Sequence, residues 1–244
     1  EKMESEAITT IFQCIESLKS GEASLVESAS QQLYALIEEP SNVYQFFLAV
    51  NLSSAVYQRK YCYTLIHRMF TAQPIGEFFK MQDFVPNFQK FALESLNSET
   101  DTRCIYFIGD LVRIICQEIL KEGGWPEIYQ ISLEISQQPT ERAAGGLHLI
   151  SSFFSSASIE DQNQLFFAII PILNNTLNST FESVRIKTFK LITDIAVSLE
   201  NPDQWEAVPT FFEAVKATVF SVYNNQRSNE ECTEVFKSMG ALID

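Results

Sequence analysis

Proline and arginine recur along this chain with a period of about 42 residues, and this repeat constrains the possible fold more than any other feature. Four prolines that open or enter apolar segments lie 40, 45 and 38 residues apart, at Pro86, Pro126, Pro171 and Pro209. Four arginines that open further apolar segments lie 44, 39 and 43 residues apart, at Arg59, Arg103, Arg142 and Arg185. Such a period indicates repeated units that stack on one another.

The apolar residues inside each unit follow a helical period. In the segment 101–121 they alternate steps of three and four and therefore share one helix face: Ile105, Ile108, Val112, Ile115 and Ile119. Asn-Gly and Asp-Gly hairpin signals are absent from the sequence. Two helices in about 42 residues match a HEAT-type repeat, whose helical hairpins bury their apolar faces by stacking. We therefore expect an all-α fold, an α-solenoid of about six HEAT-type helical-hairpin repeats in a superhelical arch; the alternative is a compact helical bundle.

Six helical pairs follow from this pattern. The first helices are expected at 4–19, 41–52, 84–97, 125–137, 160–178 and 203–224, and the second helices at 23–38, 55–70, 101–121, 140–156, 181–199 and 228–243. The loop 71–83 is expected to hold an extra helical turn. Ser158 and Ser228 are expected to cap helix starts, because an acidic residue follows each of them three positions later.

The whole chain, residues 1–244, is predicted to be a single solenoid. It starts with Glu1 rather than Met, and it ends on Leu242-Ile243-Asp244 without a helix stop signal. We therefore expect it to be a fragment of a longer protein.

Composition excludes several classes of protein. The hydrophobic content of 46% is too high for a disordered chain, and the longest unbroken apolar run, Leu165 to Leu173, is too short to insert into a membrane. The formal charge of −14 argues against direct binding of nucleic acid, because phosphates repel an acidic surface. Five scattered cysteines without a CxxC pair are typical of reduced, mostly buried thiols in an intracellular protein.

The residues do not form a recognisable catalytic or metal-binding set. The two histidines, His67 and His148, are each expected on a helix face opposite the apolar stripe. Cys62 and His67 are five positions apart and do not share a chelating face. The phosphate-binding patterns GxxxxGK[ST] and GxGxxG are also missing. The sequence thus favours a protein-binding function over an enzyme and implies no catalytic residue, metal or cofactor.

A family resemblance lies in the segment 101–157. There Gly123-Gly124 is followed by Trp125-Pro126-Glu127, and the next helix is expected to open on Thr140-Glu141-Arg142-Ala143-Ala144. This segment resembles the importin-beta (karyopherin-beta) superfamily, and most nearly its importin five branch, in which "WPE" opens the fourth repeat and "REAAL" lies on its second helix. Two departures are Gly145-Gly146 in place of larger residues, and Tyr61-Cys62-Tyr63-Thr64 where the family has a leucine- and alanine-rich helix.

The resemblance implies the amino-terminal part of a nuclear transport receptor that shuttles between cytoplasm and nucleus as a monomer. In that family a Ran-type small GTPase in its GTP form binds the concave face of the first repeats. Protein cargo usually binds further along, and Phe-Gly nucleoporins insert phenylalanines between outer helices. A net charge of −14 would also steer basic cargo towards the receptor.

Helical-wheel placement suggests which residues these partners would meet. The predicted GTPase-binding face of the second helices comprises Glu27, Gln31, Lys60, Thr64, His67, Asp110, Arg113, Gln117, Glu141 and His148. The predicted Phe-Gly site on the first helices of the fifth and sixth repeats comprises Leu165, Phe166, Ile169, Phe212 and Val215. The alternative for the first set is an ordinary solvated helix face, and for the second set a repeat-to-repeat core.

Two other functions stay open on the sequence alone. The chain could be a HEAT-repeat scaffold or adaptor unrelated to nuclear transport. It could also be the helical regulatory arm of a larger enzyme. Nucleotide-dependent binding to a Ran-type GTPase would separate the transport receptor from both.

Overall fold

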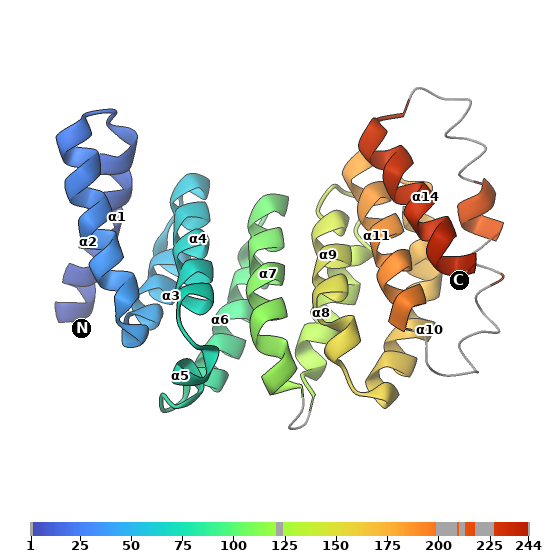
Figure 1. Cartoon of the computed structure of the whole chain (residues 1–244), viewed down its shortest axis with the longest axis horizontal. Coiled ribbons are helices and arrows are strands. Elements are labelled where there is room, and N and C mark those ends of the chain that lie inside the picture. The colour runs from blue at the N-terminus through green and yellow to red at the C-terminus, as the bar shows by residue number, and fades with distance from the viewer. Residues whose placement is uncertain (1, 121–123, 199–208, 210–212, 218–226, 244) are drawn as a thin grey trace. The chain divides into compact units, whose positions relative to one another are not determined.

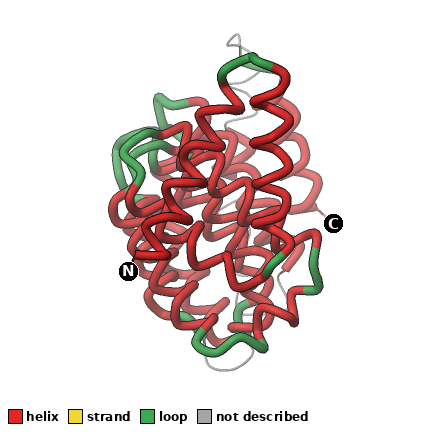
Figure 2. Tube along the Cα trace, turned by 90° about the vertical axis from the view of Figure 1, so that its left-hand side faces the viewer, coloured by secondary structure: helices red, strands yellow, loops and turns green. Residues whose placement is uncertain are grey.

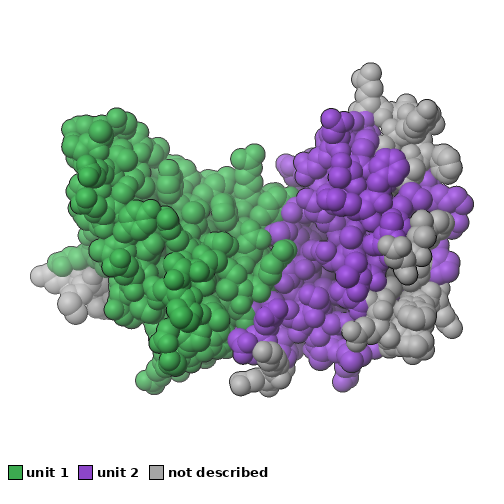
Figure 3. All heavy atoms as spheres, in the orientation of Figure 1, with its two compact units in different colours: residues 1–115 green, residues 116–244 purple. Residues whose placement is uncertain are grey.

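The structure is a computed structural model of the chain, and it describes residues 2–120, 124–198, 209, 213–217 and 227–243 (Figure 1). Within these ranges the chain consists of helices and connecting loops, without a strand (Figure 2). The chain divides into two compact units, residues 1–115 and residues 116–244 (Figure 3). Each unit is described by itself below.

Unit 1 consists of helical hairpins that pack on their sequence neighbours. Helix α1 packs against α2, α3 packs against α4, and α3 also contacts α1 and α6. The elements are α1 (Lys2–Lys19), α2 (Ala23–Glu38), η1 (Pro40–Asn42), α3 (Val43–Leu52), α4 (Val56–Ala72), α5 (Ile75–Phe79), α6 (Phe84–Ser98) and the first part of α7 (Thr102–Ile119). In Figure 1, α4 and α7 lie in front of α3 and α6.

Phenylalanine rings form much of the core of unit 1. The rings of Phe47 on α3 and Phe91 on α6 stack with centroids 4.1 Å apart. Phe70 on α4 meets Phe78 on α5 edge to face at 5.0 Å, and Phe88 lies against both Phe47 and Phe70. Offset and edge-to-face arrangements are the favoured geometries of aromatic pairs. The many phenylalanines of the sequence thus join helices of different repeats.

Unit 2 repeats the hairpin arrangement. Its elements are the end of α7, α8 (Pro126–Ser136), α9 (Ala143–Phe153), η2 (Phe154–Ser156), α10 (Ile159–Thr176), α11 (Glu182–Ser198) and α14 (Asn229–Ile243). Helix α9 packs between α8 and α11, and α11 also packs against α14. The two predicted caps are confirmed, because the hydroxyl oxygens of Ser158 and Ser228 accept hydrogen bonds from the backbone N–H groups of Asp161 and Glu231, each at 3.1 Å.

Gly146 lets α8 and α9 approach closely. A methyl group on this residue would lie 2.5 Å from Ser136 Oγ, 2.6 Å from Ser136 N and 2.8 Å from the Ser132 carbonyl oxygen. Two of these three atoms belong to the backbone, so the helices would have to separate to admit it. The close packing of α8 on α9 therefore requires a glycine at position 146.

Most predicted helix boundaries agree with the structure to within a few residues, and the prediction 23–38 coincides with α2. The predicted extra turn in the loop 71–83 is α5. The second helix of the fourth repeat starts at Ala143 rather than at 140, because residues 137–142 form turns and bends. Pro171 lies inside α10 and does not open it. The predicted helix 203–224 falls mostly outside the described residues.

The predicted apolar face of α7 is confirmed, since Ile105, Ile108, Val112 and Ile115 are fully buried and Ile119 nearly so. All five cysteines are free thiols, and four of them are buried. Among the helices that the structure describes, none combines the length and hydropathy needed to cross a bilayer.

Candidate functional site

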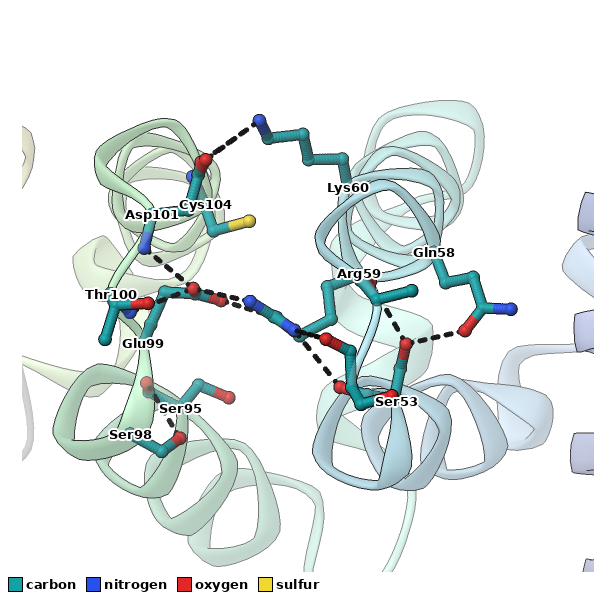
Figure 4. Close-up of polar contacts among 12 residues, drawn as sticks. Ser53, Gln58, Arg59, Lys60, Ser95, Ser98, Glu99, Thr100, Asp101 and Cys104 are labelled. Carbon is teal, nitrogen blue, oxygen red and sulfur yellow. Dashed lines mark hydrogen bonds and ion pairs between the residues drawn. The ribbon is translucent and has the colours of Figure 1, made fainter.

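Arg59, the fourth residue of α4, ties two successive repeats of unit 1 together (Figure 4). Its Nε and Nη2 atoms donate hydrogen bonds to the two carboxylate oxygens of Glu99, each at 2.8 Å. Its Nη1 atom donates to the carbonyl oxygens of Ser53 and Ser54, at 3.2 and 3.1 Å. We call this arrangement the unit 1 clamp. It joins the loop before α4 to the loop between α6 and α7.

Glu99 is only 4% exposed, and every one of its contacts in the clamp is polar. In addition to Arg59, the backbone N–H groups of Thr100 and Asp101 donate to its Oε1 atom at 3.0 and 2.9 Å. Burial on its own raises the pKa of this carboxyl, but the hydrogen bonds and positive charge of Arg59, together with the Asp101 N–H, outweigh burial and lower the pKa. The clamp is therefore a charged pair at neutral pH.

Lys60 extends the clamp towards solvent. Its Nζ atom lies 3.1 Å from Asp101 Oδ1, and both side chains are about one quarter exposed. Asp101 Oδ1 also accepts a hydrogen bond of 3.1 Å from Cys104 N, which caps the first turn of α7. Lys60 was predicted to contact a GTPase, and the structure holds this side chain between the second and third repeats.

Arg185 forms an equivalent clamp in unit 2, which we call the unit 2 clamp. It is the fourth residue of α11, and its Nε and Nη2 atoms donate to the two carboxylate oxygens of Glu231 at 2.6 and 3.0 Å. Its Nη1 atom donates to the carbonyl oxygens of Ser179 and Thr180, at 2.7 and 3.2 Å. Arg227 contacts the same buried carboxylate. Burial raises the pKa of Glu231, but the two arginines outweigh burial and lower the pKa.

In unit 1 the predicted GTPase-binding residues lie on α2, α4 and α7, and none of them is buried. Glu27, Gln31, Thr64 and Arg113 are exposed, while Lys60, His67 and Asp110 are partly exposed. The clamp fixes the spacing of α4 and α7, and thereby the spacing of the predicted residues that these helices carry. Their contact with a GTPase stays a prediction.

In unit 2 the remaining three predicted residues also reach the surface. Gln117 and Glu141 are exposed, and Glu141 accepts a hydrogen bond of 3.0 Å from the Ser183 hydroxyl. His148 Nδ1 lies 3.1 Å from Lys187 Nζ. Because an ammonium group has no lone pair, the imidazole nitrogen accepts in this contact. Glu141 and His148 are thus each linked to α11 of the next repeat.

The residues predicted to bind Phe-Gly peptides are placed differently. Leu165, Phe166, Ile169 and Val215 are at most 3% exposed and belong to the core of unit 2. Phe212 lies outside the described residues. This placement favours the alternative interpretation, a core between repeats, over an open groove at these side chains.

A hollow of about 580 Å³ opens in unit 2 at the carboxyl ends of α8 and α10. No charged side chain lines it. Its wall combines amide groups with apolar atoms, notably those of Gln137, Pro139, Ile172, Asn175 and Phe181. The residues of this hollow come from loops and helix ends without a shared period, so no sequence pattern indicates it.

Sequence reasoning also missed three exposed side chains on α2 and α4. Tyr34 and Tyr61 are 47% and 38% exposed, and the Arg68 guanidinium carbon lies 4.7 Å from the centroid of the Tyr34 ring. Neither tyrosine belongs to a predicted apolar stripe or to a predicted binding face. The signal that could have identified Tyr34 is its position next to Leu33, off the Ala29-Leu33-Ile37 stripe.

Within the described ranges, histidine, cysteine and acidic side chains do not gather in any group that could hold a metal ion. Polar side chains of the described residues join neighbouring repeats through the two clamps and through contacts such as that of Ser151 with Asp194. Burial raises the pKa of the Cys62 thiol to about 12. This cysteine is therefore uncharged at neutral pH.

Comparison with known proteins shows which solved structures share this fold. No protein-family model and no curated protein matches the sequence. Solved structures do match: the karyopherin Kap121p bound to Ste12p at a TM-score of 0.74, and the same karyopherin bound to the SUMO protease Ulp1p or to Nup53p at 0.73. Each match has 13% sequence identity and covers 98% of this chain but only 23% of the karyopherin chain. The chain therefore has the all-α HEAT-repeat solenoid fold of karyopherins, as the sequence predicted.

Proposed function

We propose that this chain is the amino-terminal part of a nuclear transport receptor of the importin-beta type, nearest to the importin five branch. It binds a Ran-type small GTPase in its GTP form, and it carries basic protein cargo between cytoplasm and nucleus. It acts as a monomer without a cofactor and catalyses no reaction. The observation that carries this proposal is the match of 98% of the chain to karyopherin structures at TM-scores of 0.73 and 0.74.

Two further observations support a binding function. The ten side chains predicted to meet the GTPase are exposed or partly exposed, and they carry mixed charge. Mixed charge suits an interface in which electrostatic complementarity sets the orientation of the partner. The matched karyopherin was crystallised with Ulp1p, Nup53p and Ste12p, and we extend protein binding as a class to this chain.

The experiment is a pulldown of a Ran-type GTPase by the immobilised chain, with the GTPase loaded with GTP or with GDP. We expect clear preference for the GTP form. The variant Gln31→Glu/Thr64→Glu adds two negative charges to the predicted face and should weaken binding about tenfold or more. The matched control is Gln82→Glu/Asn97→Glu, which adds the same charge at exposed positions outside the second helices. Equal capture of both nucleotide forms would favour a scaffold or a regulatory arm instead.

Phe-Gly nucleoporins are the second partner class that we propose. Because Leu165, Phe166 and Ile169 are buried, a phenyl ring would approach unit 2 through the uncharged hollow beside α10. Asn175→Arg places a charge in the wall of this hollow and should weaken capture by an immobilised Phe-Gly peptide. Gln164→Arg, at an exposed position of α10 outside the hollow, is the matched control. Equal capture of both variants would exclude the hollow as the entry point.

We also propose that residues 1–244 form one continuous repeat array. A compact domain of this length would have a radius of gyration of roughly 18 Å. An array of stacked helical pairs should exceed roughly 20 Å in small-angle scattering, since each helix layer adds about 8–10 Å. A measured value at the compact limit would contradict the array.

A further inference from the structure

The feature that carries a further inference is a cation on α4 that is held in place but has no carboxylate partner among the residues that the structure describes. Arg68 is exposed, and its guanidinium lies over the ring of Tyr34 on α2. It forms no ion pair with any described residue, although the chain has 31 acidic side chains against 17 basic ones. The aromatic ring orients the guanidinium and leaves its N–H groups available to another molecule.

Two exposed tyrosines with unused hydrogen-bonding capacity accompany this cation: Tyr34 lies beneath it, and Tyr61 lies on the same face of α4, seven residues before it. Tyr34 and Tyr61 expose about two fifths or more of their surface. Their hydroxyl groups form no hydrogen bond with any residue that the structure describes. Tyrosine and arginine are enriched among the residues that dominate protein–protein binding energies, because they combine large contact area with directed polar groups.

Packing between α2 and α4 fixes the position of the three side chains. Leu65 packs against the buried cluster of Cys14, Ala29 and Leu33, which sets the register of α4 on α2. Tyr61 precedes Leu65 by four residues and Arg68 follows it by three, so both lie on the same stripe of α4. Tyr34 adjoins Leu33 on α2. We call Tyr34, Tyr61 and Arg68 the tyrosine–arginine surface.

We propose that the tyrosine–arginine surface is the part of the GTPase-binding face that determines affinity, and that the GTPase presents a carboxylate to Arg68 between two apolar contacts. This inference rests on the proposed function, because the partner is the same. An arginine forms two parallel hydrogen bonds with a carboxylate, which adds geometric specificity to the charge attraction. The exposed neighbours Gln31 and Thr64 are uncharged, so they do not compensate the Arg68 charge.

The test measures the affinity of the full chain for a GTP-loaded Ran-type GTPase. Arg68→Glu should weaken binding by at least about 30-fold, and Tyr34→Ala by about tenfold, because both remove a contact at the centre of the interface. Tyr34→Phe keeps the ring beneath the guanidinium and should change the affinity less than threefold, by the usual size of one exposed hydrogen bond. Lys90→Glu makes the charge change of Arg68→Glu at an exposed position of α6 and serves as the control.

Salt dependence distinguishes a carboxylate partner from contact area alone. Arg68→Gln should show a shallower loss of affinity between low and high salt than the wild-type chain, since one ion pair is gone. Thermal unfolding of each variant confirms that the fold is intact. If the wild-type chain binds the GTP form and Arg68→Glu binds as well as Lys90→Glu, this inference is overturned while the proposed function stands. If the wild-type chain does not bind either nucleotide form, both are overturned.

Discussion

In the two clamps of this chain the arginine binds backbone carbonyl groups in the same way, but the carboxylate comes from a different element. In both, an arginine at the fourth position of a second helix donates to the carbonyl groups five and six residues before it. In unit 1 the carboxylate comes from the loop between α6 and α7, whereas in unit 2 it comes from the first turn of α14. The two clamp arginines therefore share their helix position and their carbonyl acceptors, and different elements supply the carboxylate.

The two carboxylates also differ in how their charge is balanced. Glu99 has one arginine and two backbone N–H donors. Glu231 has two arginines. Removal of an arginine from a buried pair leaves an uncompensated charge in the core. Removal of Arg59 should therefore leave Glu99 uncompensated in unit 1, whereas removal of Arg185 should leave Glu231 with Arg227 in unit 2.

The largest effect is expected for Arg59→Ala. It should lower the free energy of unfolding by about 3–5 kcal/mol, because Glu99 would stay buried without its cation. Urea unfolding followed by circular dichroism measures the change. Arg103→Ala is the control, since Arg103 is exposed and has no partner in the described structure, and it should change stability by less than about 0.5 kcal/mol. A loss at Arg59 as small as that at Arg103 would contradict the role of the clamp.

Arg185→Ala should lower the free energy of unfolding less than Arg59→Ala does, by about 1–3 kcal/mol, because Arg227 remains beside Glu231. The double variant Arg185→Ala/Arg227→Ala should then lose more than the sum of the single variants, because only the double variant leaves Glu231 without a cation. Urea unfolding of the four proteins gives this coupling directly. Strict additivity would show that Arg227 does not compensate in unit 2.

Acidification should weaken the clamps. The pKa of Glu99 in the folded chain lies below its ordinary value of 4.5, so the clamp stabilises the fold fully above that pH. The stabilisation is lost as the pH falls through the lowered pKa of the folded state. We therefore expect the stability difference between the wild-type chain and Glu99→Gln to shrink between pH 7 and pH 3, as measured by urea unfolding. A constant difference over this range would contradict a charged Glu99.

The smallest effect on stability is expected for Lys60→Ala. The Lys60–Asp101 pair is partly solvated, and such pairs contribute about 0–1 kcal/mol. If Lys60 also meets the GTPase, the same variant should reduce GTPase affinity without a comparable loss of stability. Thermal unfolding and binding of GTP-loaded GTPase, measured on one preparation, separate the two roles. Loss of stability equal to that of Arg59→Ala would show that Lys60 belongs to the buried part of the clamp.

The helices and their repeat could be read from the sequence because their signals are local. The spacing of Ile105 to Ile119 and the caps at Ser158 and Ser228 depend on residues within one helix. The arginine series was also visible, and Arg59 and Arg185 belong to it. Their partners were not predictable, since Glu99 and Glu231 are 40 and 46 residues away and come from non-equivalent elements.

The candidate sites were harder to predict than the fold. A helical wheel correctly places Glu27, Gln31 and Thr64 outside the core, but it does not indicate which exposed aromatic residues lie beside them. Tyr34 reaches the surface because it lies off the helix face on which Leu33 belongs to the buried cluster that Leu65 of α4 packs against. Leu165 and Phe166 differ in the opposite direction from Tyr34. They were predicted to line a surface groove, but they are buried in the core of unit 2.

The burial of the cysteines has a practical consequence for measuring these interactions. Cys14, Cys62, Cys104 and Cys116 are buried, and burial raises the pKa of Cys62 and Cys104 to about 12. Cys232, in the first turn of α14, is the one cysteine with partial exposure. A maleimide dye should therefore react at a single position of the native chain. The sequence thus carries a natural attachment point for fluorescence, beside the unit 2 clamp, without the removal of any other thiol.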